Sequence, residues 1–179
     1  MSQFCIGILV AICVLAGCAN KPPGLPGDEL NNPIISSSYA AVDRLITADV
    51  KSGMSRQGQV VLVASLVNVD NTSNTSIFGK MMAEQIASRL VQLDLPVIEV
   101  KLRSSLYMSE ERGEMLLSRE IKEISQRQNA SAVLVGTYAD AGSSGVYVTL
   151  KLVRAHDAKV LSATNFMLER KLVSSVINR

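Results

Sequence analysis

The residue best placed to do chemistry in this chain is Cys18, because of what precedes it. It ends the segment Leu15-Ala16-Gly17-Cys18, which closes an uncharged apolar run from Phe4 to Gly17. Small residues before a cysteine at the end of such a run form the pattern of a bacterial lipobox. There a signal peptidase cuts between Gly17 and Cys18, and the cysteine sulfur carries a diacylglyceryl group. We therefore expect residues 1–17 to be a signal peptide and Cys18 to be lipidated.

The same segment predicts where the protein resides. The apolar run is shorter than the roughly 20 residues that span a bilayer, which favours a removed signal over a retained helix. The alternative is an ordinary secretory signal in which the cysteine is incidental, and the N-terminal region is weak because no Lys or Arg precedes Lys21. Residue 19 is alanine, not the aspartate that commonly retains lipoproteins at the inner membrane. We therefore expect a lipid anchor in the outer membrane, on its periplasmic face.

Catalytic and metal chemistry have little support elsewhere in the sequence. Two of the three cysteines, Cys5 and Cys13, lie in the expected signal, so the processed chain would hold neither a free thiol nor a disulfide. The one histidine, His156, lies beside Asp157 in an expected turn, where an incidental surface residue is the simpler interpretation. One histidine without free cysteines cannot build a Cys/His zinc site. We expect no enzyme activity, no metal site and no cofactor.

Composition indicates a folded domain on a tether. The net charge is +2, basic and acidic residues are interspersed, and aromatic residues make up 4% of the chain. Nucleic-acid binding needs clustered basic residues, so we expect no nucleic-acid partner. Residues 18–38 hold four of the five prolines, which disfavour a packed core. We therefore divide the chain into a signal (1–17), a lipidated cysteine with a flexible tether (18–38) and one domain (39–179).

Hydrophobic periodicity predicts alternating helices and strands in the domain. The first strand is a β-branched run that is apolar on both faces, which suits the centre of a sheet. A serine run before Tyr39 could cap the first helix, and Gly53 would end it. A short helix would close the chain near Leu172. The expected helices cover residues 39–50, 78–93 and 115–128, and the expected strands cover residues 59–68, 97–102, 132–138, 146–152 and 160–168.

The order of these elements predicts the topology. Helices join the first three strands, and right-handed crossovers place the second and third strands on either side of the first. The last two strands add as an antiparallel meander. We predict a single small α/β domain of α+β-like character, with a mixed five-stranded sheet of order 2-1-3-4-5 packed by helices.

Several segments together resemble the FlgO-type outer-membrane lipoproteins of sheathed or ring-bearing polar flagella, over roughly residues 39–168. They are Asp43-Arg44-Leu45-Ile46, Val63-Ala64-Ser65-Leu66-Val67-Asn68, Thr75-Ser76-Ile77-Phe78-Gly79-Lys80, Leu117-Ser118-Arg119-Glu120 and Leu134-Val135-Gly136-Thr137-Tyr138. The resemblance implies a fold like that of the TolB N-terminal domain. It also implies an accessory role in the flagellar basal body, with other flagellar ring lipoproteins or further copies of the chain as partners, in support of ring assembly and motility.

Six residues in these segments are candidates for a structural or partner-binding motif, and the structural interpretation is the simpler one. Phe78 would anchor the core, and Gly79 would allow a close approach of helix and sheet, after a cap at Ser76. Gly136 in a strand suggests a bulge or a close backbone approach. The six candidates are Phe78, Gly79, Ser118, Arg119, Gly136 and Tyr138.

Two further interpretations concern the third helix and the loop before it. Ser118 would cap this helix if it begins later than expected, and Arg119 would pair with a nearby carboxylate. The acidic cluster Glu110, Glu111 and Glu114 is interpreted as a solvated loop, with a partner contact as the alternative.

A second function remains open. The LpoB-type lipoprotein activators of periplasmic cell-wall synthases also combine an outer-membrane anchor, a tether and a small α/β domain. A tether of about twenty residues reaches roughly 65 Å at most. We expect this reach to be too short to cross the periplasm to an inner-membrane synthase, which favours the flagellar interpretation.

Overall fold

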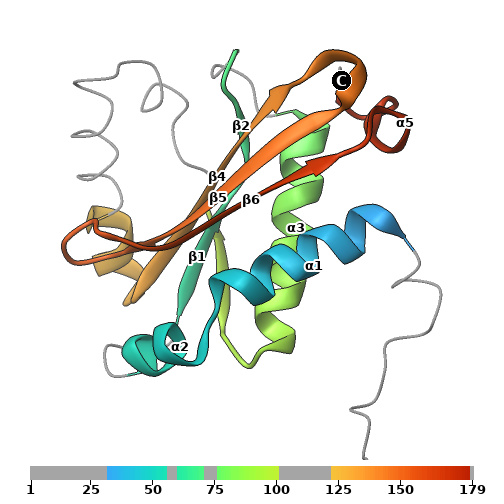
Figure 1. Ribbon diagram of the computed structural model, residues 1–179. Coiled ribbons are helices and arrows are strands. Elements are labelled where there is room, and N and C mark those ends of the chain that lie inside the picture. The colour runs from blue at the N-terminus through green and yellow to red at the C-terminus, as the bar shows by residue number, and fades with distance from the viewer. Residues whose placement is uncertain (1–31, 56–59, 71–75, 101–121, 178–179) are drawn as a thin grey trace, which may run out of the picture.

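In the computed structural model, which describes residues 32–55, 60–70, 76–100 and 122–177, helices and strands alternate along the chain (Figure 1). A helix without a label covers residues 122–128. The labelled elements are α1 (Pro33–Leu45), α2 (Ala48–Ser55), β1 (Val61–Ala64), β2 (Val67–Asn68), α3 (Ile77–Gln92), β3 (Val97–Val100), β4 (Ala132–Asp140), the 3-10 turn η2 (Gly142–Ser144), β5 (Val146–Arg154), β6 (Val160–Leu168) and α5 (Arg170–Val173).

The strands form one mixed sheet of six strands, whose main path runs β3-β1-β4-β5-β6. β1 is parallel to both β3 and β4, while β5 pairs antiparallel with β4 and β6. The predicted mixed α/β domain is therefore confirmed, and the main path follows the predicted arrangement of five strands. The difference is a sixth strand, β2, which lies off this path and pairs with β4.

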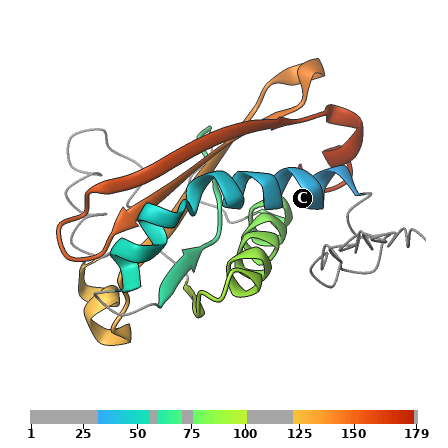
Figure 2. The ribbon, with the colours of Figure 1, turned by 60° about the horizontal axis from the view of Figure 1, so that its bottom comes forward.

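Helices pack on both faces of the sheet, but unequally. Residues of α1 and α3 join the inner faces of β1, β4 and β5 in the larger core cluster. Figure 2 shows α1 crossing beneath β6, with α3 beside β1. A smaller cluster on the opposite face contains Leu62, Val133 and Val153, against which Ile124 of the helix over residues 122–128 packs. Because both faces of β1 are covered, all four of its residues are buried, as a central strand requires.

The first helix begins earlier than the sequence suggested. α1 starts at Pro33, so residues 33–38 are helical and do not belong to a tether. The cap is Asn32, whose side-chain oxygen accepts a 2.9 Å hydrogen bond from the Ile34 amide, and not the serine run. Proline fits the first helical position because its missing N–H would be unpaired there in any case. Ser38 is buried inside the helix, where its hydroxyl donates to the carbonyl of Ile34.

The end of this helical segment also differs from the prediction. The helix breaks after Leu45, and a second helix, α2, follows after Ile46 and Thr47. Gly53 does not terminate the segment, because it lies inside α2. The side of Gly53 where a Cβ would lie is open, so its lack of a side chain is not required by packing.

Several predictions fall outside the described residues. The signal peptide, the cleavage site at Gly17 and the lipidated Cys18 lie there, as do Ser118, Arg119, the acidic cluster and the start of the third predicted helix. Within the described ranges, no helix has the length and apolar character needed to cross a membrane.

Candidate functional site

Four of the six motif residues predicted from the sequence meet in one buried cluster around Leu66. We call this cluster the Leu66 junction and define it as Leu66, Ser76, Phe78, Gly79, Gly136 and Tyr138. It connects the segment between β1 and β2, the N-terminus of α3 and the middle of β4. Phe78 and Gly79 lie in one of the sequence segments and Gly136 and Tyr138 in another, and the sequence did not identify Leu66 as the residue that they share.

Leu66 breaks the first predicted strand. Val63 is opposite Leu134 and Val67 is opposite Thr137, so the β1–β2 segment advances by four residues while β4 advances by three. The extra residue moves the backbone at Leu66 out of the ladder, where its amide bonds the carbonyl of Gly79 at 3.1 Å. This contact with α3 explains why the expected strand is divided into β1 and β2.

Both glycines of the junction are required by close contacts. A Cβ on Gly79 would overlap the carbonyl oxygen of Leu66, so a side chain there would push α3 away from the sheet. A Cβ on Gly136 would lie 2.6 Å from Cγ of Leu66 and 2.8 Å from Cδ2 of Leu150. The predicted close approach of helix and sheet at Gly79 is therefore confirmed. At Gly136 the prediction of a bulge or a close backbone approach was wrong, because the β4–β5 register is continuous there and the close neighbours are two leucine side chains.

Two aromatic residues and a serine complete the junction. The rings of Phe78 and Tyr138 meet edge to face, with centroids 4.8 Å apart. The Tyr138 hydroxyl donates a 2.5 Å hydrogen bond to Oγ of Ser76, and this Oγ accepts a second, 3.0 Å bond from the Gly79 amide. Ser76 is thus the N-cap of α3, as the sequence predicted, and Phe78 is a fully buried core residue.

The burial of the junction decides what it can do. Leu66, Phe78 and Tyr138 are at most 1% exposed, so they cannot contact a partner directly. The Tyr138 hydroxyl donates its hydrogen bond to Ser76 inside the same cluster. The junction is a structural connection that fixes α3 on the sheet.

A second connection joins α1 to α3 at the surface. Arg89 donates from Nε and from one terminal nitrogen to the two carboxylate oxygens of Asp43, at 2.8 and 2.9 Å. Its guanidinium also lies over the ring of Tyr39, 5.4 Å from the centroid. The hydrogen bonds to Asp43 raise the pKa of Arg89 above its ordinary value, although partial burial opposes this. This geometry accounts for Asp43, which belongs to the first of the sequence segments described above.

A third connection joins α5 to the end of β4. Arg170 of α5 pairs with Asp140 at the end of β4, and its Nε donates a 2.8 Å bond to the carbonyl of Gly142. The hydrogen bond from Arg170 lowers the pKa of Asp140, and the backbone amide of Gly142 adds to this effect. Thirty positions separate the two residues, so the pair could not be predicted from local sequence patterns.

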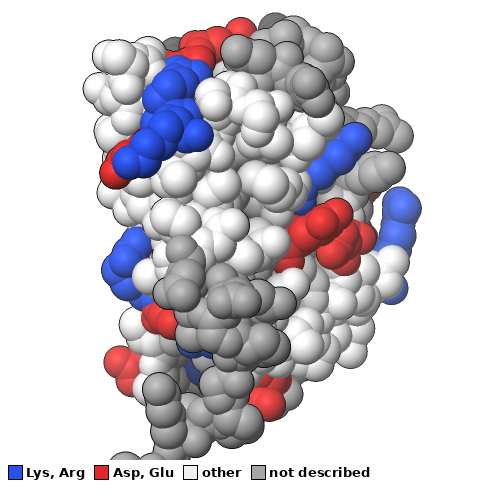
Figure 3. Space-filling model, turned by 90° about the vertical axis from the view of Figure 1, so that its right-hand side faces the viewer, with Lys and Arg blue, Asp and Glu red and all other residues white. Residues whose placement is uncertain are grey.

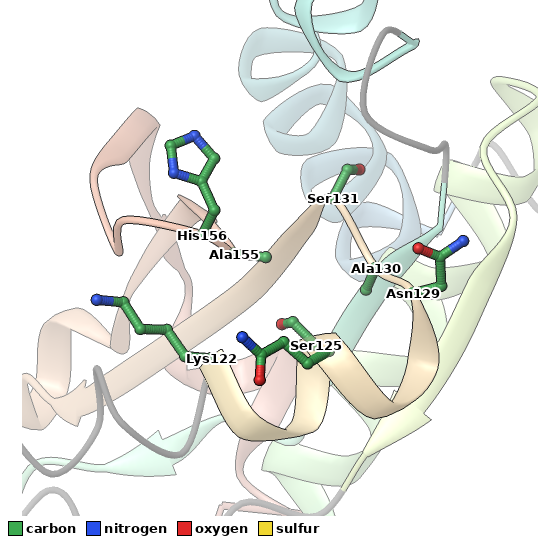
Figure 4. A pocket seen from close by; sticks show the side chains of 8 residues that line it. Lys122, Ser125, Asn129, Ala130, Ser131, Ala155 and His156 are labelled. Atoms are coloured by element: carbon green, nitrogen blue, oxygen red, sulfur yellow. The ribbon is translucent and has the colours of Figure 1, made fainter.

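A pocket of about 390 Å³ lies between the helix over residues 122–128 and the turn after β5 (Figure 4). Its lining includes Lys122, Ser125 and Ser131, together with His156, whose predicted turn is confirmed. The Ser125 hydroxyl is buried and has no hydrogen-bond partner among the described residues. Nδ1 of His156 lies 3.9 Å from Oδ1 of Asp157, and the His156 side chain is more than half exposed. No carboxylate is among the described residues that line the pocket.

Metal and nucleic-acid sites find no support in the described part of the chain. No group of three or more histidine, cysteine or acidic residues there could hold a metal ion. On the face that Figure 3 shows, acidic and basic side chains form small separate groups with uncharged surface between them. The described residues on this face do not form the continuous basic stripe that follows a phosphate backbone.

Solved structures resemble the fold. The LpoB C-terminal domain from Escherichia coli is 14% identical, with a TM-score of 0.51, over 76% of this chain and 98% of that chain. The corresponding domain from Salmonella enterica is 16% identical, with a TM-score of 0.44, over 77% of this chain and 94% of that chain. Lipoprotein GNA1162 from Neisseria meningitidis is 17% identical, with a TM-score of 0.41, over 63% and 81%. At these identities the likeness to the first domain concerns the fold alone.

No curated protein matches the chain at the sequence level. The sequence pattern of one protein family, in contrast, covers most of the described domain, from the middle of α1 to the end of α5. The model of the FlgO protein family matches residues 39–173, and the chain therefore belongs to this family of flagellum-associated lipoproteins of the cell envelope.

Proposed function

We propose that this protein is an outer-membrane lipoprotein that acts as a structural, non-enzymatic component of the flagellar basal body and supports ring assembly and motility. The observation that carries the proposal is the family match over residues 39–173. Cys18 would attach the domain to the inner leaflet of the outer membrane through its acyl chains. One acyl chain binds only marginally, so the two or three chains of a lipoprotein are what would make the attachment lasting.

The geometry of the described domain supports a role in assembly. Four of the six motif residues form a buried junction in which each glycine has a packing reason, which supports a role in the rigidity of the domain. The connections through Arg89 and Arg170 fix α1 and α5 to the rest of the domain. A ring component has to transmit force between neighbours, and a domain cross-linked in this way would deform little under load.

The proposal is tested by deletion of the gene from its natural host. We expect the deletion strain to lose swimming or stable flagella and its basal bodies to lack ring density at the outer membrane in electron tomograms. Complementation with the wild-type gene should restore both. Normal swimming with intact rings in the deletion strain would overturn the proposal.

The alternative is a lipoprotein that activates a periplasmic cell-wall synthase. Its support here is the fold likeness to the LpoB C-terminal domain, which at 14% identity does not extend to function. Affinity purification of the full chain from detergent-extracted envelopes separates the two functions. Recovery of flagellar ring proteins would support the proposal, and recovery of a cell-wall synthase in their place would favour the alternative.

A further inference from the structure

β6 is an edge strand with no protection of its own. It is the last strand on the main path of the sheet and, among the described strands, pairs with β5 alone. Its nine residues, Val160-Leu-Ser-Ala-Thr-Asn-Phe-Met-Leu168, include no charged residue, no proline and no glycine. Soluble proteins usually guard such an edge with charge, proline, a short strand or a cover, because its free backbone groups can pair with another strand.

The opposite edge of the same sheet gives a direct comparison. β3 has four residues, and the exposed Glu99 is one of them. A short strand with a charge is the guarded form of an edge, whereas a long uncharged strand is the form that accepts a partner. The difference between the two edges points to β6 as an interaction surface.

The apolar side chains of β6 are exposed near both of its ends. Val160 is 54% exposed and Met167 is 51% exposed. Met167 lies opposite Tyr147, and Val160 lies opposite Val153 after a register shift, so both are on the sheet face away from α1 and α3. If two copies of β6 pair antiparallel, the Met167 end of each strand lies beside the Val160 end of the other. The strand is therefore complementary to itself.

We propose that β6 pairs antiparallel with β6 of a second copy of this chain, about a two-fold axis at Thr164. In this register Ala163 is opposite Asn165 of the second copy, and Met167 meets the Val160–Leu161 end. Directly opposed residues must share a face of the sheet, and this register satisfies the rule along the strand. An axis through the middle residue of β6 also pairs the greatest number of residues.

The helix beneath β6 leaves room for the second copy. Arg44 donates from Nε to the Thr164 hydroxyl at 3.1 Å, which holds this charge against its own strand. The row of α1 that contains Arg44 continues through Ala40 and Ser37, four and seven positions earlier. Small residues on this flank allow two α1 helices to approach each other beneath the joined sheet.

The proposed pairing deepens the proposed function, because it identifies a second copy as the partner on one defined edge. Its strength in the cell rests on the proposed lipid anchor, since confinement to a membrane raises the effective concentration of the strands. The pairing itself can be measured without reference to flagella. If the strands fail to pair, the result of the gene deletion still stands. If the deletion strain swims normally, the measurement of pairing still stands.

Disulfide cross-linking in isolated envelopes tests the register. Full-length A163C and N165C, carrying different tags, are expressed together, and the wild-type chain serves as the blank for the cysteines at positions 5, 13 and 18. Opposed strand residues have Cα atoms within about 4.5–5.5 Å, which a disulfide can bridge. We expect a cross-linked pair that carries both tags and little product from either variant alone. Absence of the mixed product, or equal product from the single variants, would overturn the proposal.

A matched pair of lysine substitutions tests the surface. Met167 of β6 and Val91 of α3 are exposed to similar extents, 51% and 58%, so M167K and V91K should both fold. We expect M167K to weaken self-association of the full chain by about tenfold, because the two-fold axis counts the lost contact twice. V91K should associate like wild type. Equal behaviour of the two variants in sedimentation of the detergent-solubilised protein would contradict the proposal.

Discussion

The hydroxyl of Tyr138 donates a 2.5 Å hydrogen bond to Oγ of Ser76, which joins the middle of β4 to the N-cap of α3. The same Oγ accepts the amide of Gly79, so one serine serves both the sheet and the helix. Two motif residues, Tyr138 and Gly79, are thereby linked through Ser76, and the stability of the domain should depend on this link.

Removing the Tyr138 hydroxyl tests this link. Y138F keeps the edge-to-face contact with Phe78 but leaves Ser76 with the Gly79 amide alone. We expect the free energy of unfolding to fall by about 1 kcal/mol, the net value of a typical internal hydrogen bond. Urea unfolding followed by circular dichroism measures it. Y147F is the control, because Tyr147 is exposed and should tolerate the change; equal losses in both variants would contradict the account.

The losses of stability caused by alanine at three glycines should follow how closely the new Cβ approaches neighbouring atoms. G79A would strike the backbone carbonyl of Leu66, and we expect it to lose about 3 kcal/mol of stability. G136A meets Cγ of Leu66 and Cδ2 of Leu150, and because side chains can shift more easily than a backbone carbonyl, we expect a smaller loss of about 1–2 kcal/mol.

G53A is the matched control for these variants. Gly53 lies in α2 with open space around it, and alanine should stabilise that helix by about 0.5–1 kcal/mol. Urea midpoints of the three variants measure the order. A G79A variant as stable as G53A would show that α3 does not lie on Leu66 as described.

The pairing of Asp43 with Arg89 should contribute modestly to the free energy of unfolding. The pair is bidentate but partly exposed, so solvent screens it, and we expect D43N to cost about 0.5–1 kcal/mol. E123Q is the control, because Glu123 and Arg127 are largely exposed and 4.0 Å apart. Chemical denaturation at low salt measures both. The account fails at this point if E123Q costs as much as D43N.

Acid should release the Asp140–Arg170 connection. The hydrogen bond from Arg170 lowers the pKa of Asp140 below its ordinary value of 3.8, so the folded state binds fewer protons than the unfolded state there. The stabilisation is complete above the ordinary pKa and is lost as the pH falls through the lower folded value. We expect D140N to reduce the loss of stability below about pH 4, as measured by urea unfolding at several pH values. D94N, at a carboxylate that is 93% exposed, is the matched control.

The sequence predicted what depends on local rules. Ser76 as a cap, Phe78 as a core anchor and the close approach at Gly79 each follow from one residue type and its nearest neighbours. The order of the strands followed from helical crossovers and the final meander. These rules needed no knowledge of distant residues.

The errors have tertiary causes. The start of α1 was missed because proline suggested a tether by composition, whereas Pro33 occupies a helical position where its missing donor costs nothing. The break at Leu66 was missed because it depends on Gly79, which lies in another element. The pocket between Lys122 and His156 and the pair of Asp140 with Arg170 join residues far apart in the chain, which periodicity does not detect.

The central claim is that this domain serves the flagellum while it is held at the outer membrane through Cys18. The most direct test replaces residues 1–17 with the signal of a soluble periplasmic protein, changes Cys18→Ser, and measures the swimming speed of the deletion strain that carries this gene. The account predicts a soluble periplasmic protein at wild-type abundance and no recovery of swimming, whereas the wild-type gene restores it. Full recovery of swimming by the unanchored protein would contradict the account.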